Sequence, residues 1–154
     1  MGKFFRRTAV GTDMDLDRAL CFAVEHRRGV LVTQKRDGRP QLSNIMYEVS
    51  ADGTVRVSIT ADRAKYKNLA RDPRASLHVT SDDFWAYAVL EGDVELSPVA
   101  TSPDDATVDE LVEVYRSMAG EHEDWGAYRT AMVHDRRLVV RLHPTHTYGM
   151  LPTT

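Results

Sequence analysis

Apolar and polar residues alternate along much of the chain, and stretches of helical spacing are fewer. In Val55–Thr60 every second residue is apolar, so the apolar side chains share one face of a predicted strand. Apolar residues at helical spacing predict an amphipathic helix over Asp15–Arg27, which Gly29 is expected to end, a second around Val108–Tyr115 and a third over Trp125–Val133. The pattern therefore predicts a mainly β protein with flanking helices.

Turn signals connect the predicted strands in an antiparallel order. Asp37-Gly38 joins Val30–Thr33 to a return strand over about Gln41–Val49, and Asp52-Gly53 leads into Val55–Thr60. Further strands are expected over Ala75–Thr80, Trp85–Leu96 and Leu138–Leu142. Hairpin-linked strands argue against a doubly wound parallel sheet, which needs a helix between successive strands. Roughly six antiparallel strands with three or more helices favour a closed or nearly closed barrel.

Length and charge narrow the class of protein. The 154 residues suit a single domain, 1–154, and we expect 1–11 to be a loose terminus. A net charge of −3 argues against a nucleic-acid-binding protein, and no apolar run is long enough to span a bilayer. The single cysteine, Cys21, is expected to be buried on its helix and suits a reducing compartment. We therefore expect a cytoplasmic protein without nucleic-acid or membrane partners.

The densest basic cluster begins just after the strand Val55–Thr60, where a helical turn is predicted. Its members are Arg63, Lys65, Lys67, Arg71 and Arg74. Asp62 and Asp72 are too few to neutralise these side chains, and the Ser58 and Thr60 hydroxyls share the polar face of the preceding strand. A solvated helix face is one interpretation. Helix N–H groups, hydroxyls and fixed cations together favour the other, a phosphate site.

Two further groups of residues are candidates to line a site for a flat ring. Gln41 and Ser43 share one face of the return strand, and Asn44 lies on the other. One interpretation is a solvent-exposed polar face, and the other is a set of hydrogen-bond partners for the edge of a heterocycle. Trp85 and Tyr87 are two residues apart on a predicted strand and so point the same way, into ordinary packing or a pocket. The sequence predicts no metal site and identifies no catalytic residue.

Several segments resemble the pyridoxamine-phosphate-oxidase-like split-barrel superfamily of flavin-binding proteins. They are Gly38–Asn44, Val57–Ile59 followed by Arg63-Ala-Lys65 and Asn68-Leu69, and Asp72–Ser76. Within that superfamily, Tyr87–Gly92, Ala119–Trp125 and His146–Gly149 are similar to the actinobacterial branch that binds the deazaflavin coenzyme F420. The resemblance covers nearly all of the chain after about Asp15. It implies a split β-barrel, like that of FMN-binding proteins, and a homodimer with two cofactor sites at the subunit interface.

The resemblance also implies roles for individual residues. Arg63 and Lys65 would hold the cofactor phosphate, while Ser58 and Ile59 would lie along the ring and its ribityl chain. The remaining cofactor-binding residues would be Gln41, Ser43, Asn44, Asn68, Trp85 and Tyr87. Candidates for the acidic tail of F420 are Lys35, Arg36 and Arg39, or Arg136 and Arg137 reaching in from the partner subunit.

The activity implied by the resemblance is an F420-dependent oxidoreductase that transfers a hydride to an electron-poor conjugated small molecule. One alternative is an oxidoreductase of the same fold that uses FMN in place of F420. The other is a non-catalytic carrier of F420. The vitamin oxidases of the superfamily grip their substrate phosphate with a C-terminal Arg and His, which Arg141 and His143 match only loosely. Oxidation of pyridoxamine phosphate is therefore not expected. Tyr148, His146 or solvent could supply a proton to the reduced substrate.

Overall fold

An antiparallel sheet dominates the protein, for which a computed structural model describes residues 12–152, with side chains from Met14 onward. The predicted loose terminus, 1–11, lies outside these residues. The longer strands are β2 (Arg28–Gln34), β3 (Pro40–Met46), β5 (Val55–Thr60), β6 (Arg74–Thr80), β7 (Tyr87–Leu96) and β8 (Arg137–Met150). The short strands are β1 (Thr12–Asp13) and β4 (Glu48–Val49). The mainly β prediction is confirmed.

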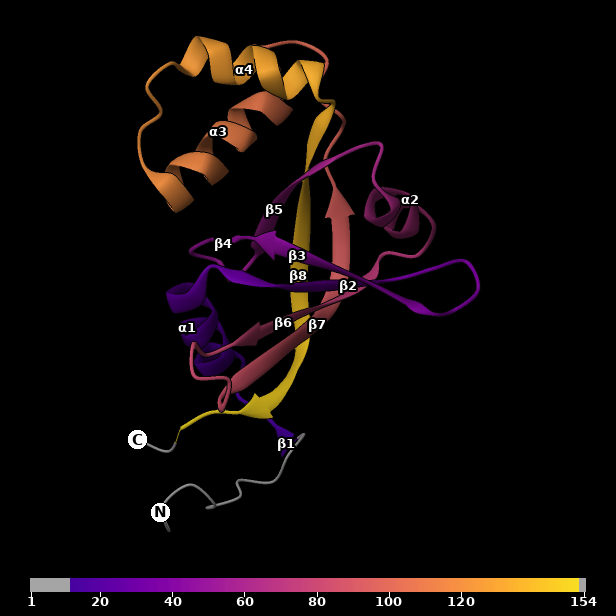
Figure 1. Cartoon of the computed structure of the whole chain (residues 1–154), viewed down its shortest axis with the longest axis vertical. Coiled ribbons are helices and arrows are strands. Elements are labelled where there is room, and N and C mark those ends of the chain that lie inside the picture. Colours follow the sequence, from indigo (N-terminus) through magenta and orange to yellow (C-terminus); the bar gives the residue numbers. More distant parts are fainter. Residues whose placement is uncertain (1–11, 153–154) are drawn as a thin grey trace.

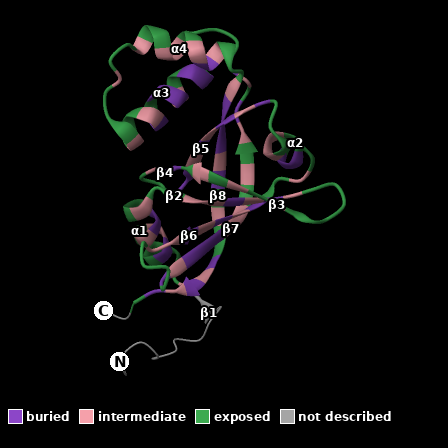
Figure 2. Cartoon of the chain, viewed as in Figure 1, coloured by how far each residue is buried: buried purple, intermediate pink, exposed green. Residues whose placement is uncertain are grey.

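The strand order is β3-β2-β6-β7-β8-β5-β4, with β1 paired to the end of β8. The sheet curls around itself as a split barrel (Figure 1). Alternation along β5 points Val55, Val57 and Ile59 into the barrel, where all three are buried. They belong to one hydrophobic core with buried residues of other strands, such as Leu77 of β6 and Leu138 of β8. Figure 2 shows buried positions in the strands of the sheet. The period-two pattern of the sequence thus corresponds to the inside and outside of the barrel.

Within residues 12–152, four helices flank the sheet. They are α1 (Leu16–His26), α2 (Ala64–Arg71), α3 (Ala106–Ala119) and α4 (Trp125–His134). Helices α3 and α4 lie together at one end of the molecule, away from α1 (Figure 1), and pack around Val139 of β8 in a second small core. Asp15, Asp105 and Asp124 cap the starts of α1, α3 and α4 with their carboxylates. None of the helices within residues 12–152 is long and apolar enough to cross a membrane.

The structure corrects three local expectations about α1 and the return strand. Arg27, in the left-handed conformation at φ 55°, ends α1 in place of Gly29. Gly29 lies within β2, where a Cβ would come within 2.7 Å of the His78 carbonyl oxygen. Cys21 is exposed, because α1 turns Ala19 and Ala23 toward the core. The return strand breaks at Tyr47, whose buried hydroxyl donates to the Ala23 carbonyl at 2.6 Å.

The last two long strands also differ from the prediction. Strand β7 begins at Tyr87, because Ser81 and Asp83 hold the preceding residues in a tight turn. Strand β8 continues through Pro144 to Met150, well beyond the predicted Leu138–Leu142. A register shift in β7 between Glu91 and Gly92 accommodates the proline, which has no N–H to donate to a ladder.

An ion network joins α3 to the outer side of the sheet. Arg56 and Arg141 are directly opposite one another on β5 and β8, an arrangement of like charges that needs neutralisation. Glu110 of α3 lies between them and pairs with both, at 3.4 Å from Arg56 Nη1 and 3.0 Å from Arg141 Nε. Arg56 also contacts buried Glu48 of β4. Burial alone would raise the pKa of Glu110, but the bonds and charges of the two arginines outweigh it and lower the pKa.

Replacing Arg56 with methionine should destabilise the protein strongly. The change leaves Glu48, whose side chain is 4% exposed, without its cation. Breaking a buried ion pair in this way costs about 3–5 kcal/mol. Arg74→Met is the control, since Arg74 pairs with Asp72 but is 75% exposed, and such pairs contribute about 0–1 kcal/mol. The measurement is the free energy of unfolding in urea, and equal losses in the two variants would contradict a stabilising role for the network.

Glu110→Gln should change how stability depends on pH. The folded-state pKa of Glu110 is lowered, so its contribution is complete above its unfolded pKa of about 4.3–4.5 and is lost as the pH falls through the folded value. At pH 7 the variant should melt below the wild type, and the gap should narrow below about pH 4.5. Melting temperatures across that range measure this. Glu123→Gln, in the exposed loop before α4, should track the wild type throughout.

Candidate functional site

A basic hollow of about 520 Å³ lies where β3, β5, the start of α2 and the start of β8 meet. Its lining residues are Gln41, Leu42, Ser43, Ser58, Ile59, Thr60, Arg63, Ala64, Lys65 and Arg137. Six of the ten residues predicted to bind a cofactor are thus brought together: Gln41, Ser43, Ser58, Ile59, Arg63 and Lys65. They come from β3, β5 and the start of α2, so the fold brings them together although they are separated in the sequence.

The hollow is electropositive because Arg63, Lys65 and Arg137 line it and no carboxylate does. Burial lowers the pKa of Lys65, and the charges of Arg63 and Arg137 lower it further. Arg63 occupies the position before α2, where no side chain caps the helix. A helix start of this kind, beside concentrated positive charge, is suited to bind an anion.

Polar side chains complete the lining. Ser58 Oγ accepts from Arg137 Nη1 at 3.3 Å, because β5 and β8 pair along this stretch. Gln41 donates to Ser43 Oγ at 3.1 Å and accepts from Thr33 Oγ1 at 3.1 Å, which fixes its amide across β3. The hollow can therefore provide three cations, three hydroxyls and an oriented amide to a polar ligand.

Four predicted residues lie outside the hollow. Asn68 is buried, donates to Thr33 Oγ1 at 3.2 Å and accepts from Arg71 at 3.1 Å, so it joins α2 to β2. Asn44 lines a separate hollow with Met46 and other residues of β2 and β3. Trp85 lies in the turn before β7 and is exposed, so it does not share a strand face with Tyr87 as expected.

Tyr87 and the candidate proton donors lie far along the sheet from the hollow. Tyr87 pairs with Met150 at the end of β8, whereas Arg137 begins that strand. His146 Nδ1 lies 2.7 Å from Glu91, and its ring is 6.0 Å from the ring of Tyr148. Within one chain, neither candidate donor lines the basic hollow.

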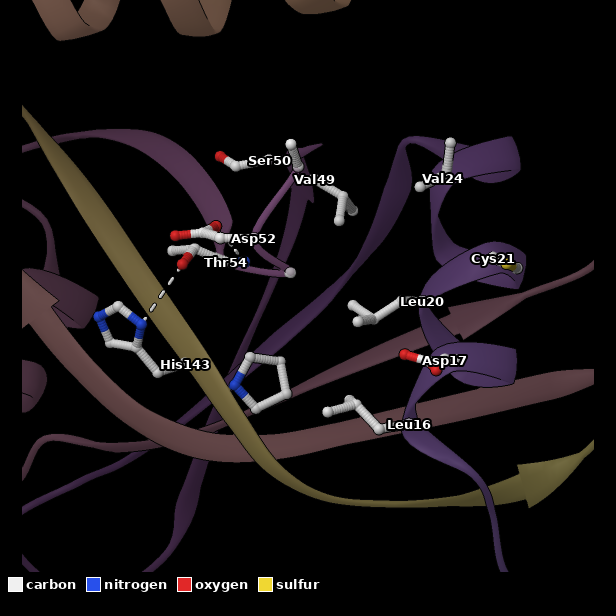
Figure 3. Close-up of a pocket in the computed structure, with 13 residues that line it drawn as sticks. Leu16, Asp17, Leu20, Cys21, Val24, Val49, Ser50, Asp52, Thr54 and His143 are labelled. Atoms are coloured by element: carbon white, nitrogen blue, oxygen red, sulfur yellow. Dashed lines mark hydrogen bonds between the residues drawn. The ribbon is translucent and has the colours of Figure 1, made fainter.

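A second hollow, of about 570 Å³, separates α1 from the turn between β4 and β5 (Figure 3). Leu16, Leu20 and Val24 line it from α1, and on the opposite side Thr54 Oγ1 lies 3.4 Å from His143 Nδ1. None of the residues predicted to bind a cofactor lines this hollow. In the part of the chain that the structure describes, no group of three or more His, Cys, Asp or Glu side chains could hold a metal ion.

Arg137 is the lining residue that the residue pattern did not place in this site. The sequence suggested it only for a tail site, entered from the partner subunit, whereas here it lies beside Arg63 and Lys65 of its own chain. Its placement depends on the β5–β8 register, which pairs Thr60 with Arg137 across a gap of 77 positions in the chain (137 − 60). No local sequence signal reports such a pairing.

The split barrel and its basic hollow define a protein suited to bind an anionic ligand. A model of the pyridoxamine 5'-phosphate oxidase family matches residues 17–151. The chain therefore belongs to this family, which is one of flavin-binding oxidoreductases.

Solved structures of low sequence identity share the fold. A conserved hypothetical protein from Mycobacterium tuberculosis superposes with a TM-score of 0.70 at 24% identity, over 96% of this chain and 94% of that one. An F420 reductase gives a TM-score of 0.61 at 22% identity, over 80% and 91%. An FMN-binding protein from Nostoc punctiforme, related to pyridoxamine 5'-phosphate oxidase, gives 0.55 at 15%, over 86% and 80%.

Proposed function

We propose that the protein is an oxidoreductase that uses coenzyme F420, held by its phosphate in the basic hollow. The observation that carries the proposal is the convergence of Arg63, Lys65 and Arg137 without a lining carboxylate. Fixed cations of this kind match a phosphate better than a neutral ligand. The likeness of the fold to an F420 reductase supports the deazaflavin over FMN.

The residues of the hollow suit this cofactor. Lys65 and Arg63 would pair with the phosphate at the start of α2, while Ser58 and the backbone of Ile59 would follow the ribityl chain along β5. Gln41 and Ser43 would reach the ring edge or the chain from β3. When bound, the reduced cofactor supplies a hydride to an electron-poor, conjugated small molecule. The protein's part is to bind, orient and exclude water.

We further propose that two copies of the chain associate through the outer face of strands β3, β2, β6, β7 and β8. Cross-strand pairing places Asn44, Val30, His78, Val89 and Tyr148 in one row across that face. Met46 and Leu42 flank the row with exposed apolar side chains. An apolar area of this kind is typical of an interface. A second copy would bring Tyr87, Trp85 or the candidate proton donors to the hollow, which they do not reach within one chain.

FMN in the same hollow is the second candidate, because FMN also presents a phosphate to the cations and an FMN-binding protein shares the fold. A carrier of F420 is the third, because neither His146 nor Tyr148 lines the hollow. Reduced cofactor offered with a panel of enones and quinones separates enzyme from carrier: tight binding without any hydride transfer would favour the carrier.

Side-by-side titration of the protein with F420 and FMN tests the proposed cofactor. We expect tighter binding of F420, and Lys65→Ala should weaken it by about ten- to a hundredfold, through loss of a charge-assisted bond to phosphate. Lys67→Ala is the matched control, since Lys67 is exposed on the same helix outside the hollow. Tighter binding of FMN than of F420 would favour FMN as the cofactor. Equal effects of Lys65→Ala and Lys67→Ala would refute the proposed role of Lys65.

Met46→Lys should weaken the proposed homodimer. Met46 is 53% exposed on the outer sheet face, where a buried ammonium would lose its hydration in the interface. Val24→Lys is the control, because Val24 is 48% exposed but lies on α1. Sedimentation velocity should show a wild-type dimer, a dimeric control and a largely monomeric Met46 variant. A monomeric wild type would refute the proposed association.

A further inference from the structure

Arg137 differs from the other partly buried arginines of the protein in having no carboxylate partner. Arg56 and Arg141 are neutralised by Glu110, and Arg129 pairs with Asp109 at 2.9 Å. Among the described residues, Arg137 forms no ion pair, and the only hydrogen bond of its side chain runs from Nη1 to Ser58 Oγ. Its Nε is buried and has no hydrogen-bond partner.

The unpartnered groups lie on one edge of the guanidinium. Nε and Nη2 form the side edge, which can donate two parallel hydrogen bonds to a carboxylate or a phosphate. The nearest charged neighbours in the hollow are Arg63 and Lys65, which repel Arg137. A buried donor without a partner and a cluster of like charges both cost free energy. An anion in the hollow would relieve both costs at once.

The backbone around Arg137 holds it at this place. The carbonyl of Arg136, a residue in the left-handed conformation at φ 53°, accepts from the Ala61 N–H at 3.0 Å. The carbonyl of Arg137 itself accepts from the Ala100 N–H at 2.8 Å. Two segments distant in the chain thus fix the start of β8, so the guanidinium enters the hollow from a rigid strand.

We propose that Arg137 is a third phosphate-binding residue, acting in the same chain as Arg63 and Lys65. The side chain turns into the hollow, and its Nε–Nη2 edge takes two phosphate oxygens while Lys65 and Arg63 take the remaining charge. This assignment rests on the proposed function for the identity of the ligand, but its anion chemistry depends only on the hollow. It differs from a role in a tail site reached from the partner subunit.

Arg137→Gln and Arg136→Gln form a matched pair of variants for the test. Arg136 is exposed, immediately precedes Arg137 and does not line the hollow. Fluorescence titrations of the full chain with F420, FMN and riboflavin should show that Arg137→Gln weakens the two phosphate-bearing cofactors by about tenfold or more. Arg136→Gln should change the affinity for FMN, which has no acidic tail, by less than about threefold, and neither variant should alter the affinity for riboflavin, which lacks the phosphate.

Arg137→Lys separates a binding role from a structural one. The lysine variant keeps the positive charge but cannot donate two parallel hydrogen bonds from one planar edge. Its affinity for FMN and F420 should therefore lie between the affinities of the wild type and of Arg137→Gln. Equal affinities of the Arg137→Gln and Arg136→Gln variants for FMN would overturn the assignment and leave the proposed function standing. A loss of riboflavin binding as large as that of FMN would also overturn it, because the effect would then not be on the phosphate.

Inorganic phosphate distinguishes failure of the inference from failure of the proposed function. If the wild type binds neither F420 nor FMN, the proposed function fails. A rise in melting temperature with phosphate that Arg137→Gln abolishes, and Arg136→Gln keeps, would still support the anion site. A rise that both variants keep, or no rise in the wild type, would overturn the assignment.

Discussion

The pairing of β8 along its whole length with β7 and β5 is the constraint on which the rest of the structure depends. Strand β8 lies between the two halves of the sheet and continues from Arg137 to Met150. Its first residues face β5, its last face β7, and the middle contacts both. The register brings Arg137 beside Ser58 and places Arg56 opposite Arg141. A shift of the β8 register by one residue would turn Arg137 and Arg141 toward the inside of the barrel and the buried residues of β8 toward the outside.

This register explains why two groups of cations lie along the same outer face of the β5–β8 pair. Arg56 and Arg141 are like charges forced together by the pairing, and Glu110 of α3 neutralises them. Four residue pairs further along the ladder, Arg137 meets Arg63 and Lys65 with no such carboxylate. The same strand pair thus carries one cationic group that is satisfied within the chain and one that is not. Electrostatically, the second is where a ligand is expected to supply the missing negative charge.

Much of the fold could be predicted because local patterns determine it. Alternation in Val55–Thr60 gave both the strand bounds and its buried face, and the capping aspartates mark where three helices begin. Interactions between distant segments could not be read from such patterns. Strand β8 passes Pro144 only because β7 shifts its register there, and β7 begins late only because Ser81 and Asp83 close a turn.

The same distinction separates the predicted and the missed parts of the site. Arg63 and Lys65 follow β5 directly, so a short sequence segment was enough to indicate an anion site. Arg137 reaches the hollow through the sheet, and Asn68 lies outside the hollow, where its buried side chain has Thr33 and Arg71 as hydrogen-bond partners. The basic cluster of the sequence is therefore two clusters in space. Arg71 and Arg74 engage a backbone carbonyl and Asp72, whereas Arg63 and Lys65 join Arg137 around a hollow without an acid.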